Sequence, residues 1–241
     1  SIFTNTSTIS SGSMSYIWDF GDGDSSTLIN PIHKYSNPGT YQVKLYAISN
    51  YEYVEMTQFF VNVFEIPTAN FTYVNACEGT PISYSSTSTL PAGNPTYEWF
   101  YGDNSAVGSG ANSNHSFVPG VYQTRLKVTV NGCSDDISKY VTQAPRANVA
   151  FTNSAVTCDN LKIDFTNNTT VDFGTLGYTW KFGDGKQSSA INPSHVYDTY
   201  STFNVVLIAN TGFGCIDSIS TTITPLESPK ADFNLIANGC T

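Results

Sequence analysis

The sequence predicts an all-β protein made of consecutive units, each a sandwich of two antiparallel sheets. Its composition favours strands, because Ser, Thr, Asn, Gly, Tyr, Phe and Val dominate while Leu, Met, Lys and Glu are scarce. Several segments alternate between apolar and polar residues, and the same motifs return at a fixed interval. Aromatic residues make up 14% of the 241 residues and charged residues 12%, which excludes a disordered tail, a coiled coil and a collagen.

An internal repeat of 81 residues organises the chain. The three tryptophans, Trp18, Trp99 and Trp180, stand at this spacing (99 − 18 = 81 and 180 − 99 = 81). Each begins a motif of Trp, any residue, an aromatic residue, Gly and Asp, in which the aspartates are Asp22, Asp103 and Asp184. An aromatic residue also stands fifteen positions before each tryptophan, at Phe3, Tyr84 and Phe165. This agreement indicates three copies of one structural unit.

A half-buried strand is predicted 23 residues after each tryptophan. There the sequence alternates with period two, so that one face of each strand is turned to the core. The residues on this face are Tyr41, Val43, Leu45 and Ala47, then Tyr122, Thr124, Leu126 and Val128, then Phe203, Val205, Leu207 and Ala209. A unit of about 80 residues with several such short strands suggests a two-sheet antiparallel sandwich with the tryptophan as core anchor.

The repeat also predicts the unit boundaries. Similar openings occur at Pro67, Pro145 and Pro229. We therefore expect unit 1 at 1–66 without its first strand, unit 2 at 67–144, unit 3 at 145–226, and the first strand of a fourth unit at 227–241. Because the last strand of unit 2 runs almost directly into Pro145, neighbouring units should be stiffly joined. Another hypothesis is that the tail from Pro229 completes unit 1 of a second copy, which would give fibres by strand addition.

The charge balance excludes some partners. Ten Lys and Arg against nineteen Asp and Glu give a formal charge of −9, so the chain is repelled by phosphate backbones and anionic lipids. Nucleic acid is therefore not an expected partner. No run of 18 apolar residues is present, so no membrane span is predicted in this segment.

The cysteines recur with the repeat. Cys77 and Cys158 each precede their tryptophan by 22 residues, and Cys133 and Cys215 follow theirs by 34 and 35. Cys240 takes the first of these two positions in unit 4. The residues allow buried free thiols or one disulfide in each unit, Cys77 with Cys133 and Cys158 with Cys215, and we favour the disulfides. Each would close a loop worth roughly 4 kcal/mol and would place the chain in an oxidising, extracytoplasmic compartment.

The motifs together closely resemble the PKD (polycystic kidney disease) domain. The Trp-x-Phe-Gly-Asp-Gly motif is followed by an Asn-Pro-x-His-x-Tyr loop at 30–35 and 192–197, and by Pro-Gly-Thr-Tyr at 38–41. Unit 2 departs from the pattern at Phe100, Tyr101 and Asn104, and unit 3 at Tyr200-Ser201-Thr202-Phe203. The resemblance covers nearly the whole chain and implies an immunoglobulin-like β-sandwich in an extracellular, multi-domain protein.

The placement of the cysteines is similar to that in arrays of very large secreted surface proteins of Bacteroidota. Such proteins include gliding-motility adhesins and other cargo of the type IX secretion system. This resemblance implies a bacterial, secreted or cell-surface protein. Its partners would be the neighbouring PKD domains of the same chain, together with cell-surface or secretion-machinery proteins.

The aspartate-rich turn of unit 1 offers a candidate metal site. Asp19, Asp22 and Asp24 alternate like the ligands of a Ca²⁺ loop. In units 2 and 3, however, only the equivalents of Asp22 recur. A Gly-Asp-Gly step also suits a tight hairpin, since glycine supplies positive φ and aspartate bonds its own backbone. We therefore expect a structural turn, with no required cofactor and Ca²⁺ as the alternative in unit 1.

The remaining polar and aromatic candidates have structural readings as well. One histidine per unit, His33, His115 and His195, is expected to stabilise a turn or pack in the core, because equivalent positions in an array cannot converge. Tyr41 and Tyr122 suggest a tyrosine corner, for which Phe203 lacks the hydroxyl. Exposed aromatics that could stack on a polysaccharide are Tyr51, Tyr53 and Tyr101, although we favour ordinary packing between strands or between domains for them. Ser218, in Asp217-Ser218-Ile219, resembles an O-glycosylation acceptor of Bacteroidota.

These observations predict a non-catalytic function. No nucleophile elbow, His-Glu-x-x-His, phosphate loop, Cys-x-x-Cys or Rossmann glycine pattern is present, so the chain is not expected to be an enzyme. We expect a structural stalk segment of a large secreted or cell-surface adhesin that extends a distal binding element from the cell. The alternative is an accessory carbohydrate- or protein-binding module of a secreted hydrolase.

Overall fold

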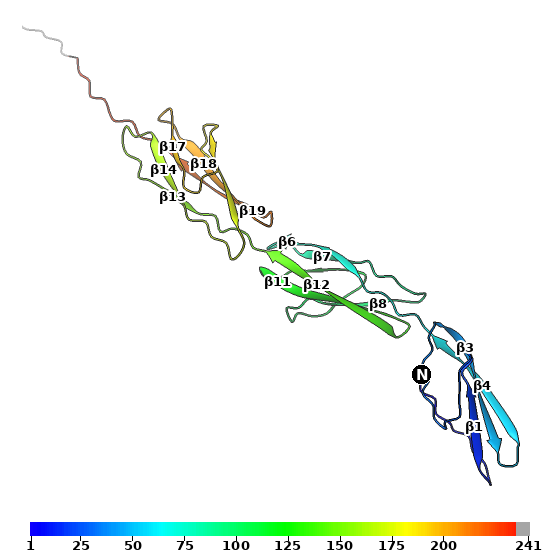
Figure 1. Cartoon of the computed structure of the whole chain (residues 1–241). Coiled ribbons are helices and arrows are strands. Elements are labelled where there is room, and N and C mark those ends of the chain that lie inside the picture. Colours follow the sequence, from blue (N-terminus) through cyan, green and yellow to red (C-terminus); the bar gives the residue numbers. More distant parts are fainter. Residues whose placement is uncertain (235–241) are drawn as a thin grey trace, which may run out of the picture.

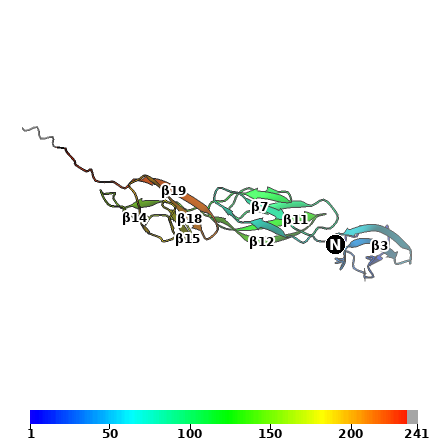
Figure 2. The same cartoon turned by 90° about the horizontal axis from the view of Figure 1, so that it is seen from above.

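The computed structural model describes residues 1–234, and all regular elements within this range are strands (Figure 1). This confirms the all-β prediction. The three units follow one another end to end in both views, which gives the protein an elongated shape (Figures 1 and 2). Within the described range there is no helix long and apolar enough to cross a membrane.

Unit 2 is a sandwich of two sheets. The smaller sheet has the order β10-β7-β5, and the larger has the order β6-β12-β11-β8-β9. All its pairings are antiparallel except that of β6 with β12. Its strands are β5 (Phe71–Val74), β6 (Ala76–Cys77), β7 (Ile82–Ser86), β8 (Thr96–Phe100), β9 (Gly108–Ser109), β10 (Asn112–His115), β11 (Gly120–Val130) and β12 (Cys133–Ala144).

Unit 3 repeats this arrangement. One sheet has the order β13-β14-β17 and the other the order β16-β15-β18-β19. In place of β6 it has a single parallel bridge from Cys158 to Leu226. The strands are β13 (Phe151–Asn153), β14 (Lys162–Asn167), β15 (Leu176–Lys181), β16 (Gln187–Ser188), β17 (Ser194–Val196), β18 (Phe203–Thr211) and β19 (Ile216–Ile223).

Unit 1 contains one complete sheet of the pair. Its order is β2-β1-β3-β4, and the opposing layer is reduced to a bridge between Ile2 and Ile32. The backbone amide of Phe3 still donates to the carbonyl of Pro31 at 3.0 Å, as that of Phe165 donates to Pro193 at 2.9 Å. The strands are β1 (Met14–Asp19), β2 (Ser25–Ser26), β3 (Gly39–Ser49) and β4 (Val54–Val63).

The tryptophans are the core anchors that the repeat predicts. All three are buried, and each indole N–H donates to a backbone carbonyl ten or eleven residues later, at 2.9–3.1 Å. Trp180 packs against Phe165 with ring centroids 5.3 Å apart, and the equivalent pairs in units 1 and 2 are 5.5 and 5.4 Å apart. The aromatic residue fifteen positions earlier is therefore the packing partner of each tryptophan.

The alternating strands and the tyrosine corners are confirmed. On the predicted face of β3, β11 and β18, eight side chains are buried with 0–6% exposure: Val43, Leu45, Thr124, Leu126, Val128, Val205, Leu207 and Ala209. The Tyr41 hydroxyl donates to the carbonyl of Asn37 at 2.8 Å, and that of Tyr122 donates to Val118 at 3.1 Å. Phe203 has no hydroxyl, but it stacks on Tyr197 at 4.1 Å and keeps the packing part of the corner.

The chain enters unit 3 directly from a strand, but it does not leave unit 3 into another strand within the described residues. β12 reaches Ala144, directly before Pro145, so no linker separates the last strand of unit 2 from unit 3. After β19, residues 227–234 are not part of any strand, although the sequence predicts a strand from 227. The equivalent strands β5 and β13 pair with β7 and β14, and residues 227–234 have no such neighbour in the described part of the chain. Cys240 lies outside the described residues.

Two turn glycines of unit 3 provide a matched test of the backbone geometry. Gly183 and Gly185 both have positive φ, at 89° and 91°. A Cβ on Gly183 would lie 2.8 Å from the backbone oxygen of Asn204, whereas one on Gly185 would meet nothing within 4 Å. Unit 2 has Asn104 at the position of Gly185, with φ of 63°, which shows that asparagine fits there.

We therefore expect Gly183→Asn to destabilise unit 3 by at least about 1 kcal/mol more than Gly185→Asn, because only the first forces backbone apart. Urea unfolding, with hydrogen exchange of the β15 and β18 amides to locate the effect, measures the difference. Equal losses for the two variants would contradict the packing argument.

Candidate functional site

The disulfide of this chain joins two units. Cys77 of unit 2 is bonded to Cys215 of unit 3, with Cα atoms 5.7 Å apart and a sequence separation of 138. Cys133 and Cys158 are free. The predicted pairs, Cys77 with Cys133 and Cys158 with Cys215, are therefore wrong.

The length of the last strand explains the error. Cys133 begins β12, and Cys77 is paired with Ala144 at its other end, eleven residues further on (144 − 133 = 11). At about 3.3 Å per residue, these two cysteines lie about 36 Å apart. A disulfide needs Cα atoms within about 7 Å, so the two cysteines of one unit cannot meet.

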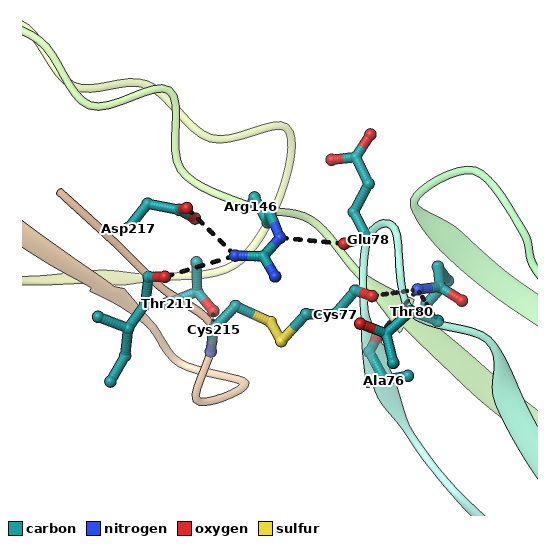
Figure 3. The surroundings of a disulfide bond; sticks show 10 residues. Ala76, Cys77, Glu78, Thr80, Arg146, Thr211, Cys215 and Asp217 are labelled. Atoms are coloured by element: carbon teal, nitrogen blue, oxygen red, sulfur yellow. Dashed lines mark hydrogen bonds and ion pairs between the residues drawn. A yellow bond between two sulfur atoms is a disulfide. The ribbon is translucent and has the colours of Figure 1, made fainter. Parts of the chain in front are cut away.

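The loop that carries Cys77 is held against the end of β12. The backbone amide of Glu78 donates to the carbonyl of Ala144 at 2.8 Å. The buried side-chain amide of Gln143 donates to the carbonyls of Cys77 at 2.7 Å and Thr80 at 3.2 Å (Figure 3). These bonds fix Cys77 at the tip of unit 2 that faces unit 3.

Cys215 lies in the tight turn between β18 and β19. Its backbone amide donates to the Thr211 hydroxyl at 3.1 Å, and the Thr211 amide donates to the Cys215 carbonyl at 2.9 Å. Gly214, with φ of 86°, supplies the left-handed residue that the turn needs. Because this hairpin tip points back toward unit 2, the buried Cys215 side chain meets Cys77 across the junction.

An arginine crosses the same junction. Arg146, one residue after the first proline of unit 3, donates from Nε to the carbonyl of Glu78 at 3.0 Å. Its Nη1 donates to a carboxylate oxygen of Asp217 at 3.1 Å (Figure 3). Both side chains are partly exposed, so the ion pair contributes at most about 1 kcal/mol. Its larger effect is to fix the orientation of the two units around the disulfide.

A second feature recurs once in each unit, at the aspartate turn. The aspartate Oδ1 accepts a hydrogen bond from the backbone amide two residues later, at 3.0–3.1 Å. Its Oδ2 lies 2.7–2.8 Å from Nε2 of the histidine, and the imidazole stacks on the aromatic residue of the motif at 3.9–4.1 Å. The groups are Asp22, His33 and Phe20, then Asp103, His115 and Tyr101, then Asp184, His195 and Phe182.

These contacts shift the ionisation of the aspartates. Burial raises the pKa of Asp103, but hydrogen bonds from Ser105 and His115 outweigh it and bring the pKa to about 2. The pKa values of Asp22 and Asp184 are also lowered, because the same kinds of bonds outweigh burial. The histidines therefore have the structural role that the sequence predicts. Each one forms a hydrogen bond with the aspartate of its turn.

The predicted Ca²⁺ ligands are only partly brought together. Ligand atoms of Asp22, Asp24 and His33 lie within 4.8 Å of one another. Asp19 is turned elsewhere and lies 3.9 Å from Lys44. Both oxygens of Asp22 already have donors within the turn, and a Ca²⁺ site takes six to eight oxygen ligands. The geometry favours the structural turn, and Ca²⁺ binding stays a prediction.

The structure separates the three aromatic candidates. Tyr51 and Tyr53 are exposed at the hairpin tip of unit 1. Tyr101 is 5% exposed, so the expectation of an exposed binding residue there is wrong. It takes the core position of Phe20 and Phe182, and its hydroxyl bonds Ser113 at 2.5 Å. Ser218 lies exposed on β19.

Comparison with known families settles what kind of domain this is. The family model of the PKD domain matches three consecutive segments, residues 3–61, 65–143 and 142–225. The chain belongs to the PKD domain family. Tandem PKD domains of this kind are typically non-catalytic modules.

Individual relatives are short or distant. A 32-residue segment, 13% of this chain, is 56% identical to "Collagenase ColQ1" of Bacillus cereus (strain Q1), of which it spans 3%. The PKD1 domain of Vibrio anguillarum Epp is 23% identical, with a TM-score of 0.33 over 36% of this chain and 100% of that one. The PKD1 domain of the Vibrio cholerae metalloprotease PrtV is 21% identical, with a TM-score of 0.31 over 34% and 99%.

Two functional features of these PKD units were not foreseen from the sequence. The Arg146 contacts across the junction carry no repeat signal, because the equivalent residues are Thr68 and Lys230. The pairing of aspartate with histidine does carry one, since both residues recur with the repeat, at separations of 11 or 12. The joint recurrence of the two residues in all three units is the signal that could have linked them.

We expect Asp103→Asn to destabilise unit 2 by about 1–2 kcal/mol at pH 7, because it removes a charge-assisted hydrogen bond to His115. The folded pKa lies below the ordinary value of 3.8, so this stabilisation is complete above pH 3.8 and is lost as the pH falls through about 2. The gap between wild type and variant, from urea unfolding at several pH values, should close over that range.

The matched control is Asp136→Asn, which alters an exposed aspartate 3.9 Å from Arg125 on the outer face of β12. It should change stability by no more than about 0.5 kcal/mol. A gap for Asp103→Asn that persists unchanged at pH 2 would show that the charge of Asp103 contributes nothing.

Proposed function

We propose that this PKD tandem is a stalk segment of a large secreted or cell-surface adhesin, built to transmit tension between a cell and a distal binding element. The observation that carries the proposal is the disulfide between units 2 and 3. A bond of this kind stabilises neither sandwich from within. It instead makes the connection between two sandwiches covalent at a second point, besides the peptide bond from Ala144 to Pro145.

The second connection changes the path of force along the chain. Tension applied to the two ends passes from Cys77 through the disulfide to Cys215 and then along β19. Residues 78–214 form a closed loop that this path bypasses. The cores around Trp99 and Trp180 lie mostly within this loop, so they cannot be drawn out while the bond is intact.

The disulfide also supports an extracellular location. Disulfides persist in oxidising compartments and are rare where thiols are kept reduced. Cys77 and Cys215 are held at Cα positions 5.7 Å apart by hydrogen bonds on both sides of the junction, which suits a permanent structural bond. A secreted or surface-exposed bacterial protein meets this requirement, and a cargo of the type IX secretion system in gliding motility is the specific setting we propose.

The alternative function is an accessory module of a secreted hydrolase. It is favoured by the names of the relatives, a collagenase and a metalloprotease, and by the exposed Tyr51 and Tyr53. Such a module would bind polysaccharide or protein through these aromatics. Binding of the chain to insoluble polysaccharide that is lost in a Tyr51→Ala, Tyr53→Ala variant would support this alternative over the stalk.

Single-molecule pulling tests the stalk. With handles on the two ends, the oxidised chain should release a contour length about 450–490 Å shorter than the chain in reducing buffer. This difference is the length of the 137 bypassed residues (214 − 78 + 1 = 137) at about 3.3–3.6 Å each.

The Cys215→Ser variant should behave like the reduced chain under both conditions. Cys158→Ser, which alters a free cysteine of the same unit, should leave the oxidised behaviour unchanged. Full extension of the oxidised wild-type chain would overturn the proposed path of force.

A further inference from the structure

We propose that Cys133 and Cys158 are half-sites of the same bond that joins Cys77 to Cys215, so that a disulfide forms at each junction whose two units carry both cysteines. Cys158 would bond the cysteine at the Cys215 position of a following unit. Cys133 would bond a cysteine at the Cys77 position of unit 1, a position that by the repeat falls before Ser1 (77 − 81 = −4). This deepens the proposed stalk, but it rests on the geometry of the two free cysteines.

Cys158 is held as Cys77 is held. Cys77 forms a parallel pair with Ala144 at the end of the last strand of its unit, and Cys158 forms a parallel bridge with Leu226 after β19. The amide following each cysteine makes the same bond, from Glu78 to Ala144 and from Asp159 to Leu226, at 2.8 Å in both. Cys158 is exposed, and its bridge to Leu226 places it beyond the end of β19, away from the Cys215 turn that contacts unit 2. A further unit would be joined at this end.

Cys133 occupies the place of Cys215 at the junction of units 1 and 2. Both follow a hairpin turn and point back toward the preceding unit. The Cys133 Sγ lies 4.0 Å from the carbonyl of Phe64. Phe64 is the unit 1 equivalent of Ala144, because Val61 and Val141 pair with Tyr41 and Tyr122 at the same register. The thiol is thus beside the strand end where, in unit 2, the Cys77 loop is docked.

The spacing of the cysteines fits a series of chain segments of equal length, each joined to the next by a disulfide. The segments Cys133–Cys158 and Cys215–Cys240 have the same length (158 − 133 = 25 and 240 − 215 = 25). The first segment contains β12 and β13, and the second contains β19. If each segment is linked to the next by a disulfide, the linkage continues wherever both cysteines recur. Unit 1 has Glu52 at the position of Cys133 (133 − 81 = 52), so the linkage that contains Cys77 begins at Cys77. The residues between the first and the second cysteine of a unit, such as those between Cys77 and Cys133, then carry no tension.

The bond-forming step is an oxidation. Two thiols lose two protons and two electrons, and the S–S bond forms as the disulfide of an oxidant is reduced to two thiols. In the oxidising compartment the oxidant is the disulfide of a thiol oxidoreductase, and in the test below it is oxidised glutathione. The same reagent forms the observed Cys77 to Cys215 bond, which serves as the internal positive control.

The test adds a following unit directly after residue 226. Residues 1–226 are joined to a second copy of 145–241, so that Leu226 precedes Pro145 as Ala144 does in the native junction. The second copy carries Ser218→Ala as a mass marker beside its Cys215. After oxidation by glutathione, the chain is alkylated without reduction and digested, and its disulfide-linked peptides are identified by mass spectrometry.

We expect the first Cys158 to be linked to the marked Cys215 and protected from alkylation, while Cys133 remains alkylated. In the unextended chain both Cys133 and Cys158 should be alkylated. Changing the marked Cys215 to Ser should restore alkylation of the first Cys158.

An alkylated first Cys158 in the extended chain, with the Cys77 to Cys215 bond formed, would overturn the inference. A bond from Cys158 to the unmarked Cys215 of its own unit would do the same. Neither result bears on the path of force through the Cys77 to Cys215 bond, which the pulling experiment tests. The stalk proposal and this inference can therefore fail independently of each other.

Discussion

The fully extended last strand of each PKD unit is the constraint from which the architecture follows. In unit 2, β12 runs from Cys133 to Ala144 without a break and ends directly before Pro145. An extended strand is stiff and cannot fold back, so it sets the length of the sandwich and carries its ends apart. The hairpin tip and the Cys77 loop therefore lie at opposite ends of the unit. Cys77, Cys133 and Cys215 therefore each face a neighbouring unit.

The aromatic core keeps that strand straight and the units alike. A tryptophan, its aromatic partner and the buried face of the central strand fill each sandwich. Beside them the aspartate, the histidine and the stacked aromatic rings close the turn that follows the tryptophan strand. Substitutions within this set preserve its physical role: Tyr101 replaces phenylalanine in the stack, and Asn104 replaces glycine at positive φ. The unit thus tolerates sequence drift while its length and its ends stay fixed.

Most of the fold could be predicted from the sequence, because the repeat shows which residues of the three units occupy equivalent positions. Alternation of period two located the buried faces of β3, β11 and β18, and the tryptophan spacing located the cores. Equivalence alone does not say which neighbours touch, however. A bond within each unit and a bond from each unit to the next satisfy the same 81-residue periodicity, so spacing could not decide between Cys133 and Cys215 as the partner of Cys77. The decision depends on strand length and direction in space, which the period does not contain.

The disulfide between units also has a different energetic meaning from one within a unit. A bond inside a sandwich would act on the unfolded ensemble of that sandwich alone. The bond from Cys77 to Cys215 closes a loop that contains most of both cores. If either core unfolds, Cys77 and Cys215 therefore stay next to each other. Stability of the connection then no longer depends on the stability of the sandwiches. A tandem whose purpose is to keep its length needs this separation, and the hairpin tip that reaches back to the preceding unit provides it.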